Sequence, residues 1–229
     1  LGGNAPFIVF ENADIDAAVE GAVASKYRNA GQTCVCSNRL LVQASIYEEF
    51  TQKLTKTVKQ FKLGNGSVNN TNIGPLIDKK AAEDVCNLID DAVSKGAHVV
   101  TGGARAEAGD NFVQPTILTD VSPEMRLFSE EIFGPVAPLI KFDTEEEAIE
   151  LANDTEFGLA AYFYSQNNNQ IWRVSEKLEF GIVCVNEGII SNEMAPFGGI
   201  KESGQGREGS KYGLDDYLEL KYVCLGGIE

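Results

Sequence analysis

Apolar residues recur along the chain in two alternating spacings, one typical of helices and the other typical of strands. After Asp78, apolar residues such as Ala82 and Val85 lie three or four positions apart, which places them on one face of a helix. Residues 181–186 instead form a short apolar run, as in a strand that a parallel sheet buries on both faces. Because such segments alternate throughout, the sequence predicts a layered α/β fold with a largely parallel sheet.

The ends of the expected elements are marked by capping and stop signals. Two helices are expected to begin at capping boxes, Ser45 with Glu48 and Thr144 with Glu147, in which hydroxyl and carboxylate satisfy free backbone amides. The final segment, residues 217–223, alternates apolar and polar side chains as a half-exposed edge strand does, and edge strands can pair with another chain. The other expected helices cover residues 14–28, 79–95 and 168–178, and the strands residues 39–42, 98–102, 113–121, 135–142, 160–165 and 181–186.

Length and charge restrict the class of protein. A chain of 229 residues can bury one sizeable core, and no repeat or low-complexity linker divides it. With 34 acidic and 19 basic residues the net charge is -15, which repels nucleic-acid phosphates and anionic lipid surfaces. No apolar run reaches the roughly 18 residues that span a bilayer. We therefore expect neither nucleic acid nor membrane as a partner.

Cysteine and histidine usage restrict the chemistry. The five cysteines are odd in number and lack framework-like spacing, which favours a reduced compartment such as the cytoplasm or the mitochondrial matrix. The single histidine, His98, is expected at the start of a strand. We therefore expect no metal site and no Ser-His-Asp or Cys-His mechanism, since each needs a positioned imidazole.

Cys34 is the candidate nucleophile. It follows Gly31, Gln32 and Thr33 in a turn between a helix and a strand, where a small substrate can reach it. A buried structural thiol is the commoner case in general, but this turn is not a core environment. Without a nearby histidine, the thiolate must be activated by desolvation and by backbone amide dipoles.

Residues 204–209 match the G-x-G-x-x-G fingerprint of dinucleotide-binding turns. That fingerprint needs an apolar strand immediately before it, whereas residues 198–203 are polar and glycine-rich, so we reject the match. Taken alone, residues 130–135 are an ordinary helix end and residues 196–199 a plain turn. These two segments become informative only together with the cysteine turn.

The ordered motifs at residues 1–6, 31–34, 131–135 and 196–199 resemble the aldehyde dehydrogenase superfamily over the entire chain. Residues 34–38, 186–191 and 206–213, together with Arg28, resemble its succinate-semialdehyde dehydrogenase branch. The resemblance implies an aldehyde dehydrogenase catalytic domain at residues 1–214 and a C-terminal oligomerisation segment at residues 215–229. It also implies a homo-oligomer formed through the C-terminal strand.

The resemblance implies a role for each of several residues in an NAD- or NADP-dependent oxidation. Cys34 would attack the aldehyde carbonyl, and its own backbone amide would hold part of the oxyanion. Glu131 would bind the ribose hydroxyls next to the nicotinamide, and Phe133 would pack near the cofactor. Arg28, six residues before Cys34, would clamp the distal carboxylate of a small semialdehyde.

Two further residues would complete the substrate site. Ser191 is the candidate hydroxyl that assists the arginine, although an amide would do so if Asn192 occupies the contact position. Phe197 would line the aldehyde tunnel. The pair Cys34 and Cys36 could form a reversible disulfide under oxidation, and a second thiol that merely fills space in the strand is an equal alternative.

The resemblance places the general base, most of the cofactor site and a second carboxylate-binding arginine before residue 1. We therefore expect this chain to fold as a catalytic domain but to turn over poorly or not at all. Two other classes stay open: a non-catalytic oligomerisation module, and an acylating dehydrogenase that transfers the acyl group to coenzyme A or phosphate.

Overall fold

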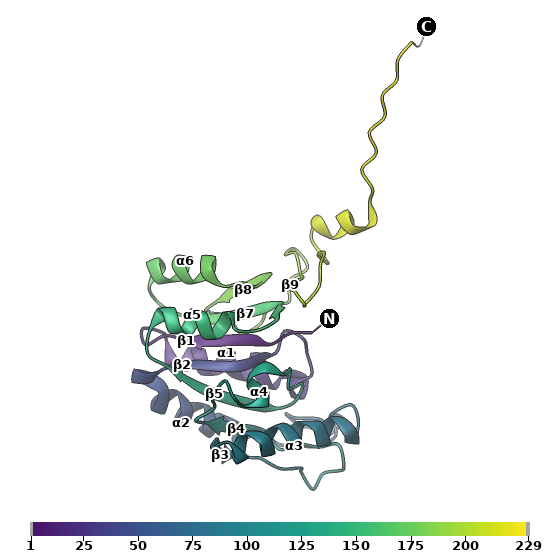
Figure 1. The fold of residues 1–229 in the computed structure, drawn as a ribbon. Coiled ribbons are helices and arrows are strands. Elements are labelled where there is room, and N and C mark those ends of the chain that lie inside the picture. Colours follow the sequence, from purple (N-terminus) through teal and green to yellow (C-terminus); the bar gives the residue numbers. More distant parts are fainter. Residues whose placement is uncertain (1, 228–229) are drawn as a thin grey trace.

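The fold is centred on a seven-stranded sheet in the order β3-β4-β5-β2-β1-β7-β8, in a computed structural model that describes residues 2–227 (Figure 1). Every neighbouring pair is parallel except β3 and β4. The expected α/β fold with a largely parallel sheet is confirmed. The strands are β1 (Ala5–Val9), β2 (Ser37–Gln43), β3 (His98–Thr101), β4 (Thr116–Thr119), β5 (Val136–Phe142), β7 (Ala160–Tyr164) and β8 (Ile182–Val185).

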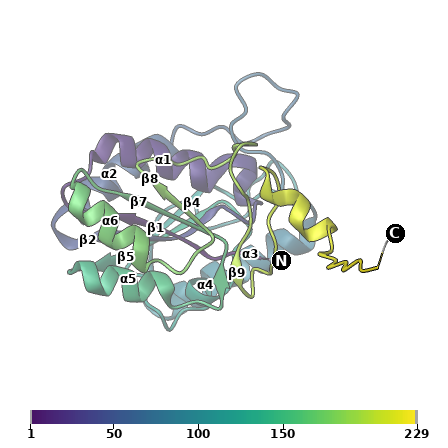
Figure 2. The ribbon, with the colours of Figure 1, turned by 90° about the horizontal axis from the view of Figure 1, so that it is seen from above.

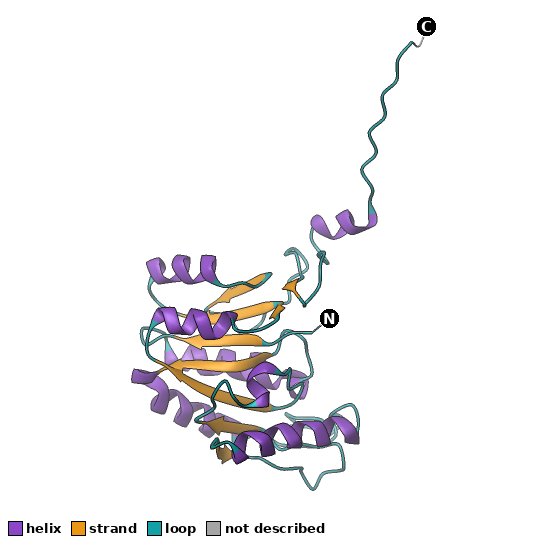
Figure 3. Ribbon diagram, in the orientation of Figure 1, coloured by secondary structure: helices purple, strands orange, loops and turns teal. Residues whose placement is uncertain are grey.

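Helices cover both faces of this sheet (Figures 2 and 3). The crossover from β1 to β2 moves toward the β3 edge of the sheet. The crossovers from β5 to β7 and from β7 to β8 move toward the opposite edge. Because parallel crossovers are right-handed, this reversal puts α1 on one face and α5 and α6 on the other. The helices are α1 (Ile15–Tyr27), α2 (Tyr47–Val58), α3 (Lys79–Ser94), α4 (Arg126–Ser129), α5 (Glu145–Asn153) and α6 (Asn168–Lys177).

Side-chain caps fix most of the helix starts. Asp14 accepts a hydrogen bond from the Ala17 amide at 3.1 Å, and Asp78 caps α3 in the same way. The capping box predicted at Thr144 is confirmed for its hydroxyl, which accepts a hydrogen bond from the Glu147 amide at 3.2 Å. The capping box predicted at Ser45 is wrong, because α2 begins after Ile46 without a side-chain cap. The Ser45 hydroxyl instead donates a hydrogen bond to the Glu11 carboxylate at 2.9 Å.

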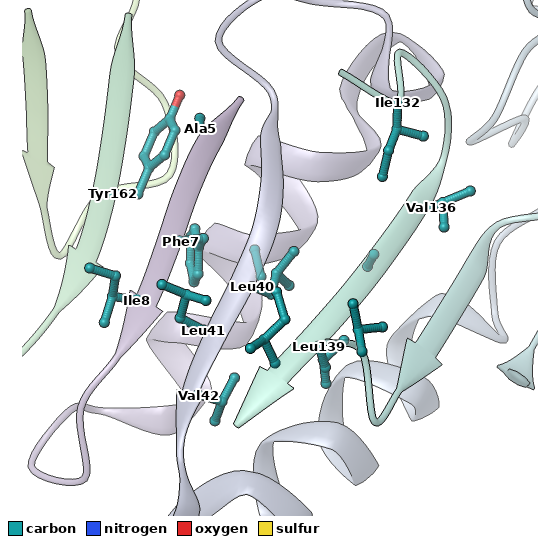
Figure 4. Packing of buried hydrophobic residues seen from close by; sticks show 14 of the residues in the cluster. Ala5, Phe7, Ile8, Leu40, Leu41, Val42, Ile132, Val136, Leu139 and Tyr162 are labelled. Carbon is teal, nitrogen blue, oxygen red and sulfur yellow. The ribbon is translucent and has the colours of Figure 1, made fainter. Parts of the chain in front are cut away.

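The core lies along the central strands, whose side chains are buried on both faces (Figure 4). Phe7 and Ile8 of β1 and Leu40 and Leu41 of β2 have no solvent exposure. Two layers of helices enclose these strands, so side chains on both faces of the sheet are shielded from water. This explains why β1 and the central residues 40–42 of β2 are continuous apolar runs rather than alternating ones.

Two expectations about strands are wrong. β8 lies at the edge of the sheet and is only half-buried, whereas its sequence predicts a strand buried on both faces. Residues 217–223 form no strand within this chain: η3, a 3-10 helix (Tyr212–Tyr217), leads into an extended, exposed segment (Figure 1). An alternating pattern needs a partner strand to become a sheet, and the described chain supplies none.

The remaining described elements are short. They are η1 (Arg28–Gly31), η2 (Ala44–Ile46) and an antiparallel pair, β6 (Phe157–Gly158) with β9 (Ile200–Lys201). Among the described residues, no helix is both long enough and apolar enough to cross a membrane.

Candidate active site

The turn that presents Cys34 is built from left-handed backbone. After α1 ends at Tyr27, the residues Asn29, Ala30 and Gly31 have φ values of 52°, 55° and 78°. A side chain on Gly31 would collide with the backbone carbonyl of Gly134, so only glycine allows these two turns to touch. The reversal of hand ends the helix and carries the chain into an open turn before β2.

Cys34 is half-buried at the wall of a cavity of about 590 Å³. The opposite side of the cavity includes Phe197, Arg207 and Glu208. Phe197 and Glu208 exchange backbone hydrogen bonds of 2.9 and 2.7 Å, which bring the two glycine-rich C-terminal segments face to face. Residues 204–209 thus form part of the cavity wall, as a loop rather than a dinucleotide-binding turn.

Burial and charge act against ionisation of Cys34. Burial raises the pKa of the thiol, and the carboxylates of Glu131 and Glu208 contribute in the same direction. The backbone amides of Cys34 and Val35 lower the pKa, as expected for this turn. Burial therefore disfavours formation of the thiolate at equilibrium, whereas a thiolate with little hydration is a stronger nucleophile, so activation by desolvation stays a prediction.

The Glu131 turn lies directly beside the cysteine turn. Glu131 Oε1 accepts a hydrogen bond from the Gly3 amide at 3.1 Å, and the Gly3 backbone packs against the Cys34 carbonyl. Burial raises the pKa of Glu131, while the Gly3 amide and the Lys26 ammonium act to lower it. Phe133, two residues on, has φ 51° and a ring that is 43% exposed. The structure thus brings Cys34 and Glu131 together across almost a hundred residues of sequence.

Arg28 and Ser191 lie apart from the Cys34 cavity. Arg28 is exposed and lines a separate hollow of about 300 Å³, together with Tyr27, Phe61 and Ile189. Ser191 is exposed and lines neither hollow. The neighbouring Asn192 is occupied locally, since its side-chain oxygen accepts from the Met194 amide at 2.9 Å. Of the three expected substrate residues, only Phe197 shares a cavity with Cys34.

Cys36 is buried at the start of β2, and all five cysteines are free thiols. Its thiol donates to the Lys26 carbonyl at 3.2 Å, on the side of α1. Lys26 is itself fully buried, and its Nζ has no hydrogen-bond partner among the described residues. Burial lowers the pKa of Lys26 and raises the pKa of Cys36, while each group opposes the shift of the other.

Sequence reasoning missed three residues at this site: Lys26, Asn38 and Glu208. Glu208 lay within a motif that was rejected as a cofactor turn and within residues 206–213, which carried the family resemblance, but it was given no role at the site. Lys26 and Asn38 are polar residues inside regular elements, where exposure is the ordinary expectation. The feature that could have drawn attention to them is their spacing of eight and four residues from Cys34.

A model described as the aldehyde dehydrogenase family matches residues 1–223. The chain is 61% identical to the succinate-semialdehyde dehydrogenase (NADP(+)) GabD of Escherichia coli (strain K12), covering 99% of this chain and 47% of that protein. It is 57% identical to the 3-sulfolactaldehyde dehydrogenase of Pseudomonas putida, covering 100% of this chain and 47% of that protein.

A crystal structure of succinate-semialdehyde dehydrogenase from Burkholderia pseudomallei superimposes with a TM-score of 0.97 at 56% identity, covering 99% of this chain and 47% of that one. This chain therefore spans less than half the length of these relatives. The match to the family model covers nearly the whole chain, and the fold agrees with that of the solved relative. The chain belongs to the aldehyde dehydrogenase family.

Proposed function

We propose that this chain is the thiol-bearing part of an enzyme that oxidises succinate semialdehyde to succinate with NAD or NADP. The observation that carries the proposal is the position of Cys34, half-buried in a cavity and beside the turn of a partly free carboxylate, Glu131. Similarity to two succinate-semialdehyde dehydrogenases over 99% of the chain supports this choice of substrate.

In the proposed reaction, the Cys34 sulfur attacks the aldehyde carbon and forms a C–S bond. The carbonyl oxygen becomes an oxyanion, which the Cys34 backbone amide stabilises as a hydrogen-bond donor. Loss of hydride from that carbon leaves a thioester on Cys34, and water then cleaves the thioester to release the acid and the thiol. When bound, the nicotinamide cofactor would supply the hydride acceptor.

The residues present fit part of such a cofactor. Glu131 Oε1 is held by the Gly3 amide, while Oε2 accepts no hydrogen bond from the described residues and is free to accept from ribose hydroxyls. The Phe133 ring is largely exposed on the same turn and offers an apolar face. Most of the cofactor site would lie outside this chain, so we propose that the isolated chain turns over slowly or not at all.

We propose Arg28 as the group that recognises the distal carboxylate. Among the described residues, no carboxylate forms a salt bridge with Arg28, so its guanidinium is available to an anion. The surrounding hollow, lined by Val23, Phe61 and Ile73, would place apolar walls beside that contact. Ser191 or Asn192 would assist from the exposed segment that follows β8.

A second substrate class is favoured by one relative. The 57% identical protein from Pseudomonas putida is named a 3-sulfolactaldehyde dehydrogenase, whose substrate carries a sulfonate where succinate semialdehyde carries a carboxylate. A guanidinium can bind either anion. We propose the carboxylate, because more of the similar proteins carry the succinate-semialdehyde name.

The test of the proposed function is alkylation of Cys34 with iodoacetamide, followed by peptide mapping. We expect succinate semialdehyde to protect Cys34 and to leave Cys86 unprotected, because Cys86 is a half-buried thiol outside the cavity. In Arg28→Met, protection by succinate semialdehyde should weaken about tenfold or more, while protection by the uncharged butanal should persist. Sulfolactaldehyde, tested in competition with succinate semialdehyde, shows whether the site prefers a sulfonate or a carboxylate.

Equal labelling of the five thiols, unaffected by any aldehyde, would contradict the proposal and favour a non-catalytic role.

The rate of Cys34 labelling also tests the charge environment of the thiol. Because the pKa of Cys34 is raised above the ordinary value of a thiol, labelling should still accelerate about tenfold per pH unit between pH 7 and 9. A rate that levels off near pH 7 would contradict the raised pKa.

We also propose that the chain is a homo-oligomer through residues 217–223. The alternating side chains of this segment are exposed, with Leu220 and Tyr222 fully or nearly fully in solvent. The half-buried β8 leaves one edge of the sheet open within the described chain. An extended segment and an open parallel-sheet edge are complementary through backbone hydrogen bonds.

A further inference from the structure

Two buried asparagines connect the three chain segments that meet at Cys34. Asn38 lies on β2, four residues after Cys34, and Asn4 lies immediately before β1; their exposures are 3% and 1%. The Asn38 amide group donates to Asn4 Oδ1 at 2.8 Å. Asn4 in turn donates to the Phe128 carbonyl at 2.9 Å, at the end of α4.

Asn38 also brackets Glu131 on both sides. Its Nδ2 donates to the Glu130 carbonyl at 3.0 Å, and its Oδ1 accepts from the Ile132 amide at 3.2 Å. These contacts fix the peptide groups before and after Glu131, so the Glu131 side chain is left to point toward Gly3. The adjacent Glu130 points the other way, into a bidentate pair with Arg126 at 2.7 and 2.9 Å.

The bracketed turn needs such support because its conformation is costly. Phe133 has φ 51°, a left-handed backbone conformation that is unfavourable for a residue with a β-carbon. Glu131 is half-buried, and burial raises its pKa. A carboxylate held away from water in a strained turn would relax outward unless other contacts hold the backbone.

We infer that Asn38 is a positioning residue for Glu131: its buried amide clamps the Glu131 turn against the start of β2, directly after the Cys34 turn, and keeps the carboxylate beside Gly3. The description of Glu131 as a cofactor ligand rests on the proposed function. The clamp itself rests only on the hydrogen bonds between Asn38 and residues 130 and 132.

Asn153, the last residue of α5, provides a matched control. It makes the same bracket, with Nδ2 donating to the Lys177 carbonyl and Oδ1 accepting from the Glu179 amide, both at 2.9 Å. The variants Asn38→Leu and Asn153→Leu keep the shape and remove each bracket without adding charge. Asn38→Ala leaves room for water and replaces Asn38→Leu in the experiment if the leucine variant does not fold.

The experiment is an NMR titration of the Glu131 carboxyl carbon in the whole chain, with Glu131→Gln to assign the resonance. In Asn38→Leu and Asn38→Ala we expect the pKa of Glu131 to fall toward its ordinary value, because the carboxylate gains solvent. We also expect hydrogen exchange of the Ile132 amide to accelerate about tenfold. Asn153→Leu should leave both readouts unchanged even if it lowers the melting temperature.

An unchanged Glu131 titration in folded Asn38 variants would overturn the inference, and so would an equal shift in Asn153→Leu. Neither readout requires a cofactor or an aldehyde. Failure of the proposed function would instead appear as unprotected Cys34 in the alkylation test, with the Glu131 titration still responding to Asn38.

Discussion

At the scale of single residues, Arg39 has an unusual environment for a charged group. It is fully buried on β2, and its guanidinium donates to the carbonyls of Asn4, Leu151, Ala152 and Asp154. Burial lowers its pKa to about 10, so it remains a cation at neutral pH. Three of these carbonyls, those of Leu151, Ala152 and Asp154, lie at the C-terminal end of α5, where helix dipoles favour positive charge. The cation therefore compensates for the free carbonyls of α5.

We predict that Arg39→Leu lowers the free energy of unfolding by about 3 kcal/mol or more, because it leaves several buried carbonyls without donors. The matched control is Arg126→Leu, which removes a half-exposed arginine and its pair with Glu130. That change should cost about 1 kcal/mol or less. Urea unfolding monitored by circular dichroism measures both, and equal losses would show that the Arg39 contacts are not important.

The site residues differ in how far sequence could identify them. The place of Cys34 in an open turn was predictable, because Gly31 and its polar neighbours indicate a turn; its role as nucleophile stays a prediction. Lys26 and Asn38 were not, because their burial depends on α1 and the Glu131 turn closing over β2. Those contacts join segments distant in sequence, and local pattern holds no information about them.

At the scale of elements, polar pairs hold the outer helices together. Glu145, in the first turn of α5, receives two hydrogen bonds from the Arg173 guanidinium of α6, at 2.8 and 2.7 Å. Arg173 lowers the pKa of Glu145. Sequence predicted the start of α5 from its cap and the bounds of α6 to within one residue. It did not predict the edge position of β8, since strand order depends on which strands meet in three dimensions.

We predict that Glu145→Gln lowers the free energy of unfolding by about 1 kcal/mol at pH 7. A carboxyl group with a lowered pKa stabilises the fold above its ordinary value of 4.5, and this contribution disappears as the pH falls through the folded-state value. The variant and the parent should therefore converge in stability under acid. Glu146→Gln is the control, because Glu146 shares the first turn of α5 but makes no salt bridge among the described residues.

At the scale of the whole molecule, the C-terminal segment lies outside the packed domain. Residues 218–227 are exposed, and Leu220, Tyr222 and Leu225 present apolar side chains to solvent. Sequence predicted the alternation of this segment but assigned it to a strand, which the single chain does not form. The position of the segment away from the packed domain could not be read from a local pattern.

We predict that deleting residues 218–229 converts an oligomer to a monomer in light scattering while the melting temperature of the monomer changes little. The packed domain loses no buried side chain through this deletion, because the described part of the segment is exposed. As a control, replacing Leu220 and Tyr222 with serine should weaken association without shortening the chain. A full-length chain that is already monomeric would refute the proposed association.

The strand order has a consequence for how the domain folds. β1 pairs with β2 soon after it is made, but its other neighbour is β7, and the partners Phe7 and Tyr162 lie 155 positions apart. Closing so long a loop is slow, and until residue 164 is available the centre of the sheet has an open edge. Partly synthesised chains would thus expose their most apolar strand to neighbours, which makes this domain dependent on chaperones or on slow, dilute refolding.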